Sequence, residues 1–165
     1  GNSDLLAEEF ARGATDAGNQ VEKITLAGKS IGFCRGCLAC QNTRRCVISD
    51  DAGSIVEKML TADVIAFATP IYYYEMSGQM KTMLDRSNPL FTADYAFRDI
   101  YMLSTAAEDG AEVPERAVGG LQGWINCYEQ ARLAGTVFGG GVNERGEIRQ
   151  HPEKLREAYE MGRAV

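Results

Sequence analysis

Apolar residues recur along the chain with two alternating spacings, one typical of helices and the other typical of strands. Helical spacing is found over residues 6–17, 55–60, 76–84, 118–128 and 155–162. Strand-like runs fall between these segments, at residues 21–26, 64–68, 100–105 and 133–138. Alternation of this kind predicts an α/β fold with a doubly wound parallel sheet.

The strand-like run 64–68 is entirely apolar and ends at Thr69 and Pro70. A run of this kind is typical of a central parallel strand that is covered on both faces. In doubly wound sheets, ligands bind at the carboxyl ends of the strands, near the point where the strand order reverses. We therefore expect a ligand site among the loops 70–78 and 104–110 and the glycines that follow Phe138.

The first expected helix begins at the start of the sequence, whereas a doubly wound domain normally opens with a strand. Asn2 and Ser3 are good N-caps for this helix, and Gly18 is a suitable C-terminal stop. We expect a single domain over residues 1–165 whose sheet lacks its first strand and whose natural chain continues upstream of Gly1. An intact five-stranded sheet built from these residues alone would contradict that expectation.

Composition narrows the classes of function. The chain has 165 residues, 45% of them hydrophobic and 24% charged, which suits a globular domain with a substantial core. A net charge of −6 disfavours sequence-independent binding to nucleic acid. No apolar run approaches the length of a membrane span, so we expect no membrane partner and a cytoplasmic location.

Candidate chemistry is concentrated in a run of cysteines with the spacing C-x2-C-x2-C-x5-C, made up of Cys34, Cys37, Cys40 and Cys46. Four thiolates are the right number for one tetrathiolate centre. Three arginines, Arg35, Arg44 and Arg45, lie in the same segment, where positive charge would stabilise thiolates. Three interpretations remain open: a 4Fe–4S cluster, a zinc ion, or a loop of free thiols.

Two further residues have structural interpretations. Cys127 lies within an apolar helical pattern, next to Tyr128, and we expect it to be a buried small hydrophobic residue. Asp85 and Arg86 are adjacent at the end of an expected helix, where they could pair as structural residues.

Several segments, taken together and in order, resemble the NADPH-dependent FMN reductase family, a branch of the flavodoxin-like fold. They are Gly1-Asn2-Ser3, the cysteine run followed by Asp50-Asp51, Thr69-Pro70-Ile71-Tyr72-Tyr73, and Lys81-Thr82-Met83-Leu84-Asp85-Arg86. The cysteine spacing is most similar to the iron–sulfur flavoprotein subgroup, which carries FMN and a 4Fe–4S cluster. The resemblance implies a flavodoxin-like, three-layer fold.

The resemblance also implies where FMN would bind. It assigns cofactor contacts to Gly1, Asn2 and Ser3, to Thr69, Pro70, Ile71, Tyr72, Tyr73 and Tyr74, and to Thr105. The first set would hold the FMN phosphate, because the free amides of a helix N-terminus attract anions. The second would form a platform for the flavin ring, although the tyrosines could equally pack a subunit interface. Thr105 lies among small residues that would let the backbone approach the ring, or that simply form a turn.

These observations predict an FMN-dependent redox protein that transfers electrons or carries out NAD(P)H-dependent reduction, with no catalytic side chain of its own. The expected partners are a small-molecule electron donor or acceptor, or a redox protein, and the expected assembly is a homodimer or homotetramer. Two alternatives are kept. One is a cluster-free NAD(P)H:FMN or quinone reductase, and the other is a non-enzymatic, zinc-stabilised binding module.

Overall fold

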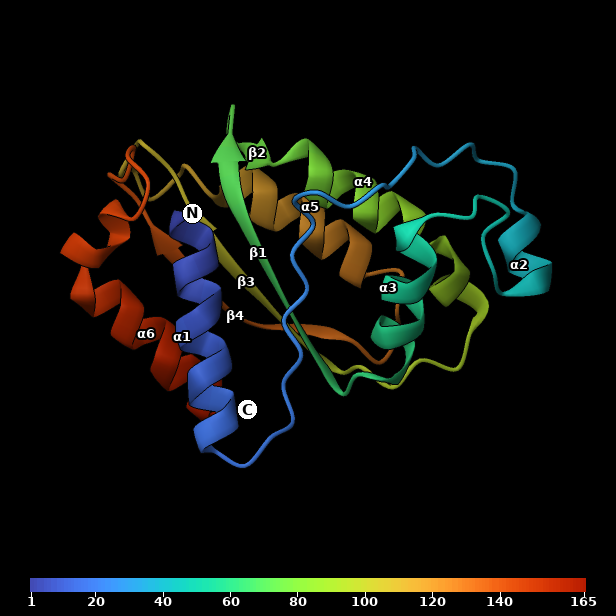
Figure 1. Ribbon diagram of the computed structural model, residues 1–165, viewed down its shortest axis with the longest axis horizontal. Coiled ribbons are helices and arrows are strands. Elements are labelled where there is room, and N and C mark those ends of the chain that lie inside the picture. Colours follow the sequence, from blue (N-terminus) through green and yellow to red (C-terminus); the bar gives the residue numbers. More distant parts are fainter.

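The computed structural model describes residues 1–165 and has three layers, with a central sheet between two layers of helices (Figure 1). In chain order its elements are α1 Asn2–Asp16, α2 Ala39–Thr43, α3 Asp51–Thr61, β1 Val64–Tyr72, β2 Glu75–Met76, α4 Gly78–Arg86, η1 Asn88–Thr92, β3 Asp99–Thr105, α5 Glu115–Ile125, β4 Arg132–Gly139, η2 Glu147–Gln150 and α6 Pro152–Arg163. Helices α1 and α6 cover one face, and α3, α4 and α5 lie on the other.

The sheet has the strand order β2-β1-β3-β4. Strands β1, β3 and β4 are parallel, and Pro70 of β1 is in register with Thr105 of β3. The two-residue strand β2 runs antiparallel to the end of β1, because the chain turns back after Tyr72. The predicted α/β class is therefore confirmed, but the sheet is mixed rather than wholly parallel, and the five-stranded sheet does not form.

Strand β1 is less covered than its all-apolar sequence predicts. Ala66 and Tyr72 are exposed, whereas every residue of β3 from Ile100 to Thr105 is buried. The reason is that β3 has a parallel neighbour on each side, while β1 pairs only with β3 until it meets β2 at Ile71. The expectation of a strand covered on both faces is wrong for β1 and describes β3.

The expected strand at residues 21–26 is absent. None of the backbone hydrogen bonds outside the regular elements joins this segment to β1. The segment is held by side chains instead: Lys23 pairs with Asp4 at 2.8 Å and with Glu8 at 3.0 Å, and Ile24 packs against the core. The alternating apolar residues of this segment are thus partly buried without forming a strand, because a strand also needs backbone hydrogen bonds to a neighbouring strand.

The outer helices pack closely through glycine. A Cβ atom added at Gly13 of α1 would lie 2.0 Å from the carbonyl oxygen of Tyr159 in α6, and one added at Gly162 would lie 2.0 Å from that of Phe10. The backbones of α1 and α6 can therefore approach only because both positions lack a side chain. This contact fixes α1 on the sheet, and with it the position of its N-terminus.

The helix ends agree with the sequence in part. Asp50 caps α3 by accepting a hydrogen bond from Ala52, as expected, and Gly18 adopts a φ of 97° just beyond α1. The N-cap of α1 is Gly1 rather than Asn2 or Ser3, and no side chain caps this end. No helix combines the length and the apolar character that a membrane span requires.

Candidate functional site

The carboxyl ends of β3 and β4 are joined by backbone hydrogen bonds between the loops that follow them. Ala106 N donates to Gly139 O at 3.2 Å, and Val142 N donates to Ala106 O at 2.9 Å. Gly140 allows this approach, since a Cβ there would lie 2.8 Å from the carbonyl oxygen of Glu108. The two loops therefore form one rigid edge at the end of the sheet where the sequence predicts a ligand.

Asn2 ties the N-terminus of α1 to the same edge. Its side-chain Nδ2 donates to Glu144 O at 2.9 Å, and its Oδ1 accepts from Gly146 N at 2.9 Å and from Ile148 N at 3.3 Å. The Asn2 amide is thus used by the protein itself. The backbone amides of the first turn of α1 have no capping side chain, so they remain available to an anion.

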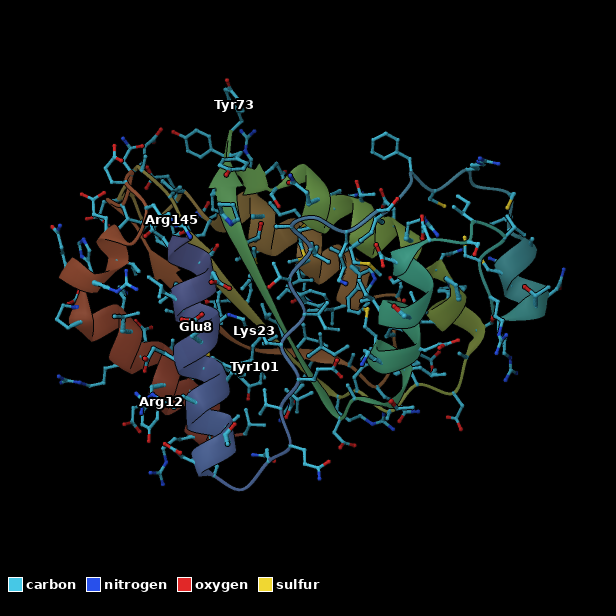
Figure 2. All side chains as sticks on the ribbon, in the orientation of Figure 1. Glu8, Arg12, Lys23, Tyr73, Tyr101 and Arg145 are labelled. Carbon is cyan, nitrogen blue, oxygen red and sulfur yellow. The ribbon has the colours of Figure 1, made fainter.

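Arg145 adds positive charge at this end of the molecule and lies near the start of α1 (Figure 2). The pKa of Asp4, in the first turn, is lowered chiefly by its hydrogen bond to Lys23, with a smaller contribution from the charge of Arg145. An exposed cation beside a helix N-terminus strengthens the attraction for a phosphate. Arg145 could not be found from sequence patterns, because its proximity to α1 depends on the turn that the Asn2 side chain holds.

The tyrosine loop, residues 70–77, comprises the last residues of β1, the turn at Tyr73 and Tyr74, and β2, and it lies at the same edge. Tyr73 and Tyr74 have positive φ angles of 51° and 66°, which are strained for large side chains. Tyr73 is 98% exposed and extends beyond the end of β1 (Figure 2). The Tyr74 hydroxyl donates to Glu108 at 2.6 Å, which raises the pKa of Tyr74 and joins this loop to the loop after β3.

Four of the other predicted contact residues, Thr69, Pro70, Ile71 and Thr105, are buried or half-buried, whereas Tyr72 is exposed. Thr69 is 1% exposed, and its hydroxyl oxygen accepts a hydrogen bond from Ser77 N at 3.0 Å. Thr105 and Ile71 are also buried, and Pro70 is half-buried within the sheet. The structure therefore brings the three predicted segments to one edge, but offers a ligand the tyrosine rings and backbone groups rather than the threonine side chains.

A second candidate site lies at the other end of α4. All four clustered cysteines line one small pocket, together with Arg35, Leu38, Val47, Ile48, Asp85, Arg86, Asn88 and Pro89. None of the cysteines is in a disulfide. Cys34 and Cys37 are exposed, Cys46 is half-buried and Cys40 is buried. Asn88 Nδ2 donates to the sulfur of Cys40 at 3.1 Å.

The donor set of this cysteine pocket fits a tetrathiolate centre in number and kind. No three acidic, histidine or cysteine side chains lie close enough together to hold a single metal ion. Four sulfurs around one zinc ion would be about 3.8 Å apart, given a Zn–S bond of roughly 2.3 Å. A four-iron cluster separates its thiolates further, because iron and sulfide lie between them. The structure thus places four thiols around one pocket without bringing them into the geometry of a bound metal ion.

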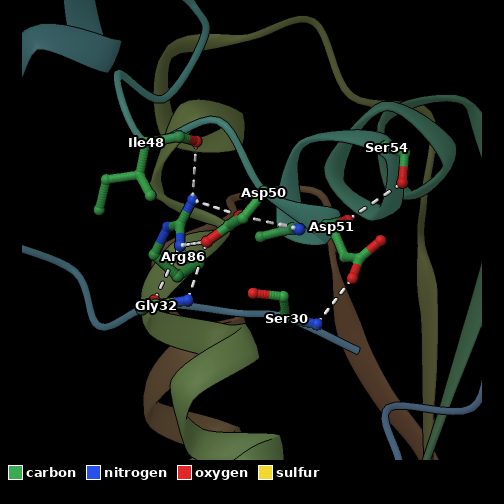
Figure 3. Close-up of polar contacts among 8 residues, drawn as sticks. Ser30, Gly32, Ile48, Asp50, Asp51, Ser54 and Arg86 are labelled. Carbon is green, nitrogen blue, oxygen red and sulfur yellow. Dashed lines mark hydrogen bonds and ion pairs between the residues drawn. The ribbon is translucent and has the colours of Figure 1, made fainter. Parts of the chain in front are cut away.

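A buried ion pair closes the base of the cysteine loop, residues 32–48 (Figure 3). Arg86 of α4 is 1% exposed and binds Asp50 through both terminal nitrogens, at 2.6 Å and 2.9 Å. Asp50 Oδ2 also accepts from Gly32 N at 2.8 Å. The Arg86 guanidinium, more than the backbone donors, lowers the pKa of Asp50 to about 2.

The ion pair of Arg86 and Asp50, called the clasp below, contacts the backbone at both ends of the loop. Arg86 Nη1 donates to Gly32 O at 2.8 Å, and Nη2 donates to Ile48 O at 3.2 Å. Beside it, Asp51 accepts from Ser30 N at 2.7 Å (Figure 3). The cysteine loop is therefore anchored at its base by one arginine from α4 and two consecutive aspartates.

Comparison with known proteins decides the family. The sequence matches the profile of the NADPH-dependent FMN reductase family over residues 1–143. The chain belongs to this family. It is 39% identical over 90 residues to an iron–sulfur flavoprotein of Methanocaldococcus jannaschii, a match that covers 54% of this chain and 47% of that relative. An iron–sulfur flavoprotein of Archaeoglobus fulgidus is 27% identical over 165 residues, or 100% of this chain and 73% of that relative.

Solved structures agree on the fold of this FMN reductase family member. The NAD(P)H:quinone oxidoreductase from Methanothermobacter marburgensis superposes with a TM-score of 0.74 at 17% identity, over 99% of this chain and 88% of the other. The predicted family, its iron–sulfur flavoprotein relatives and the flavodoxin-like class are confirmed. The chain spans about half of the first relative's length, so these matches identify the family rather than a reaction.

Two sequence expectations about this family member are wrong. Asp85 pairs with Lys81 at 2.6 Å on the surface of α4, while Arg86 turns inward to Asp50. Cys127 is exposed, because α5 ends at Ile125 and leaves it outside the apolar helical face. One signal could have found Arg86: it follows Met83 by three residues and so falls on the buried face of α4.

Proposed function

We propose that the chain is an FMN-dependent oxidoreductase that binds FMN at the carboxyl edge of the sheet and takes electrons from NAD(P)H. The observation that carries this proposal is the convergence of an uncapped helix N-terminus and an exposed aromatic loop at one edge, joined through Asn2 and Tyr74. Membership of the NADPH-dependent FMN reductase family supports the same cofactors.

The protein's own contribution is binding and orientation. The first-turn amides of α1 and the nearby Arg145 would hold the phosphate, and the strained backbone at Tyr73 and Tyr74 would present rings and amides to the flavin. Bound FMN would supply hydride acceptance from NAD(P)H and electron delivery to an acceptor. No side chain at this edge is required to move a proton.

We further propose that Cys34, Cys37, Cys40 and Cys46 hold a 4Fe–4S cluster. Support comes from the four free thiols around one pocket and from relatives named iron–sulfur flavoprotein. The cluster would supply one-electron transfer beside the two-electron chemistry of the flavin. The chain would then exchange electrons with a small molecule or a redox protein as a cytoplasmic homodimer or homotetramer.

Flavin titration tests the first proposal. Quenching of FMN fluorescence on addition of the purified chain should report saturable binding, and Tyr73→Ala should weaken it at least tenfold. Phe91→Ala is the matched control, because Phe91 is also an exposed aromatic residue, at 50%, but lies in η1. Equal affinity for FMN in the two variants would contradict the assignment of the tyrosine loop.

Iron analysis tests the second proposal. After anaerobic reconstitution with iron and sulfide, the chain should retain close to four irons, and Cys40→Ser should retain far fewer. Cys127→Ser is the control, since this thiol is exposed and outside the pocket. Zinc in place of iron would favour the binding-module alternative. FMN-dependent NADPH oxidation without any bound metal would favour the cluster-free quinone reductase.

A further inference from the structure

We propose that Asn88 and Arg86, at the C-terminal end of α4, set the reduction potential of the centre held by the four clustered cysteines. This inference rests on the cluster assignment proposed above. It concerns two side chains that bind no metal themselves, but that line the pocket from the last residue of α4 and the first residue of η1. Their part is to place hydrogen-bond donors against the sulfur atoms.

Asn88 shows the clearest contact. Its side-chain Nδ2 lies 3.1 Å from the sulfur of Cys40, the one buried cysteine of the four. Asn88 is the first residue of η1, and the preceding Ser87 is fully buried, with its hydroxyl accepting from the Trp124 indole at 2.9 Å. The donor is therefore held by the core rather than by the loop that carries the cysteines.

Arg86 provides the second, independent observation. Its two terminal nitrogens are used by Asp50 and the loop backbone, but its Nε is buried and has no hydrogen-bond partner. A buried N–H without a partner is rare and points to a missing acceptor. Arg86 lines the cysteine pocket. The pKa of Arg86 is raised chiefly by its hydrogen bond to Asp50.

The physical consequence concerns charge. A cluster on four thiolates becomes more negative when it accepts an electron, so N–H donors directed at its sulfur atoms stabilise the reduced state more than the oxidised one. Two such donors, one of them cationic, would raise the reduction potential. Arg86 is the last residue of α4, whose other end begins at the tyrosine loop, and Asn88 follows two residues later in η1, so α4 would connect the two sites.

The test is a redox titration of the reconstituted chain, with FMN bound, followed by the EPR signal of the reduced cluster. Asn88→Leu preserves bulk but removes the donor. It should shift the reduction equilibrium about tenfold toward the oxidised state, which is about 59 mV for a one-electron couple. Arg86→Lys keeps the charge without the Nε donor and should shift it in the same direction by less. Asn126→Leu, the same change on an exposed residue at the end of α5, should leave the potential unchanged.

Every outcome is decisive. A native potential in Asn88→Leu, with normal iron content, would overturn the inference and leave the cluster proposal standing. A variant that folds but holds no cluster would show a structural role and would also overturn the inference. If the unmodified chain holds no cluster, the cluster proposal and this inference both fail. The FMN proposal is tested separately, by the fluorescence titration.

Discussion

The two ends of helix α4 differ in how they hold their candidate sites. At the N-terminal end, the tyrosine loop is built locally: Thr69 and Ser77, eight residues apart, bond to each other, and Ser77 caps the helix by accepting from Met80 N. At the C-terminal end, the cysteine loop is held by Arg86, whose partners Gly32 and Asp50 are 54 and 36 residues away in sequence.

The difference shows how each site holds exposed side chains in a defined position. The tyrosine loop stores strain in its own backbone, at two residues with positive φ, and presents a ring that is 98% exposed. The cysteine loop also has two non-glycine residues with positive φ, Leu38 and Arg44, and it contains the short helix α2. Its base, however, is held by the distant ion pair of Arg86 and Asp50. Local turns therefore position the first site, whereas the second combines local turns with one buried, long-range ion pair.

Breaking the clasp should have the largest effect. Arg86→Met leaves the Asp50 carboxylate, whose side chain is 8% exposed, with backbone N–H donors but no cationic partner, and should lower the free energy of unfolding by about 3 to 5 kcal/mol. Urea denaturation monitored by circular dichroism measures this loss. The matched control is Lys81→Met, which removes a cation from the exposed Lys81–Asp85 pair of the same helix and should cost less than about 0.5 kcal/mol. Similar losses in both variants would contradict the account.

Acid should weaken the same clasp. The pKa of Asp50 is lowered to about 2 by Arg86, so the pair stabilises the fold above the ordinary Asp pKa of about 4 and stops doing so as pH falls toward 2. In the apoprotein, the difference in unfolding free energy between the native chain and Arg86→Met should shrink by roughly 2 kcal/mol between about pH 5 and pH 2. A difference that is constant with pH would show that the ion pair is not its source.

At the other end of α4, the expected loss is smaller. Thr69→Val preserves shape but removes the oxygen that accepts from Ser77 N, leaving a buried donor unpaired at a cost of about 1 to 2 kcal/mol. Thr61→Val makes the same change at an exposed helix end and should stay within about 0.5 kcal/mol of the native chain. Denaturation midpoints of the two variants measure the contrast. Equal midpoints would mean that this hydrogen bond does not order the loop.

The smallest effect should have the opposite sign. Tyr73→Asn places a residue that tolerates positive φ at a position with φ of 51°, and should raise the free energy of unfolding by about 0.5 kcal/mol. The same variant should bind FMN more weakly, because the exposed ring is lost. Thermal unfolding and fluorescence titration on one preparation measure both effects. A variant that is less stable yet binds FMN normally would contradict the idea that strain here serves the ligand.

The contrast between the ends of α4 also explains what the sequence could predict. Features with a local signature were found: the strand before Pro70, the helix around Met80 and Met83, the Asp50 cap and the run of cysteines. The role of Arg86 was not found, because its partner lies 36 residues away and no short pattern encodes such a distance.

The failures have the same cause. Residues 21–26 have the alternation of a strand, but strand formation depends on a neighbour that only the tertiary structure supplies or withholds. Asn2 has the right chemistry for a phosphate site, yet its amide is used by the turn after β4. In both cases the sequence shows the chemistry of the side chains but not which other part of the chain they contact.

The central claim, that α4 joins a flavin site to an iron–sulfur site, is tested most directly by one absorption spectrum. The chain would be reconstituted anaerobically with FMN, iron and sulfide and then freed of excess reagents. We predict two flavin bands over a broad brown absorption that disappears in Cys40→Ser while the flavin bands remain. A colourless protein, or one whose brown absorption persists in that variant, would contradict the account.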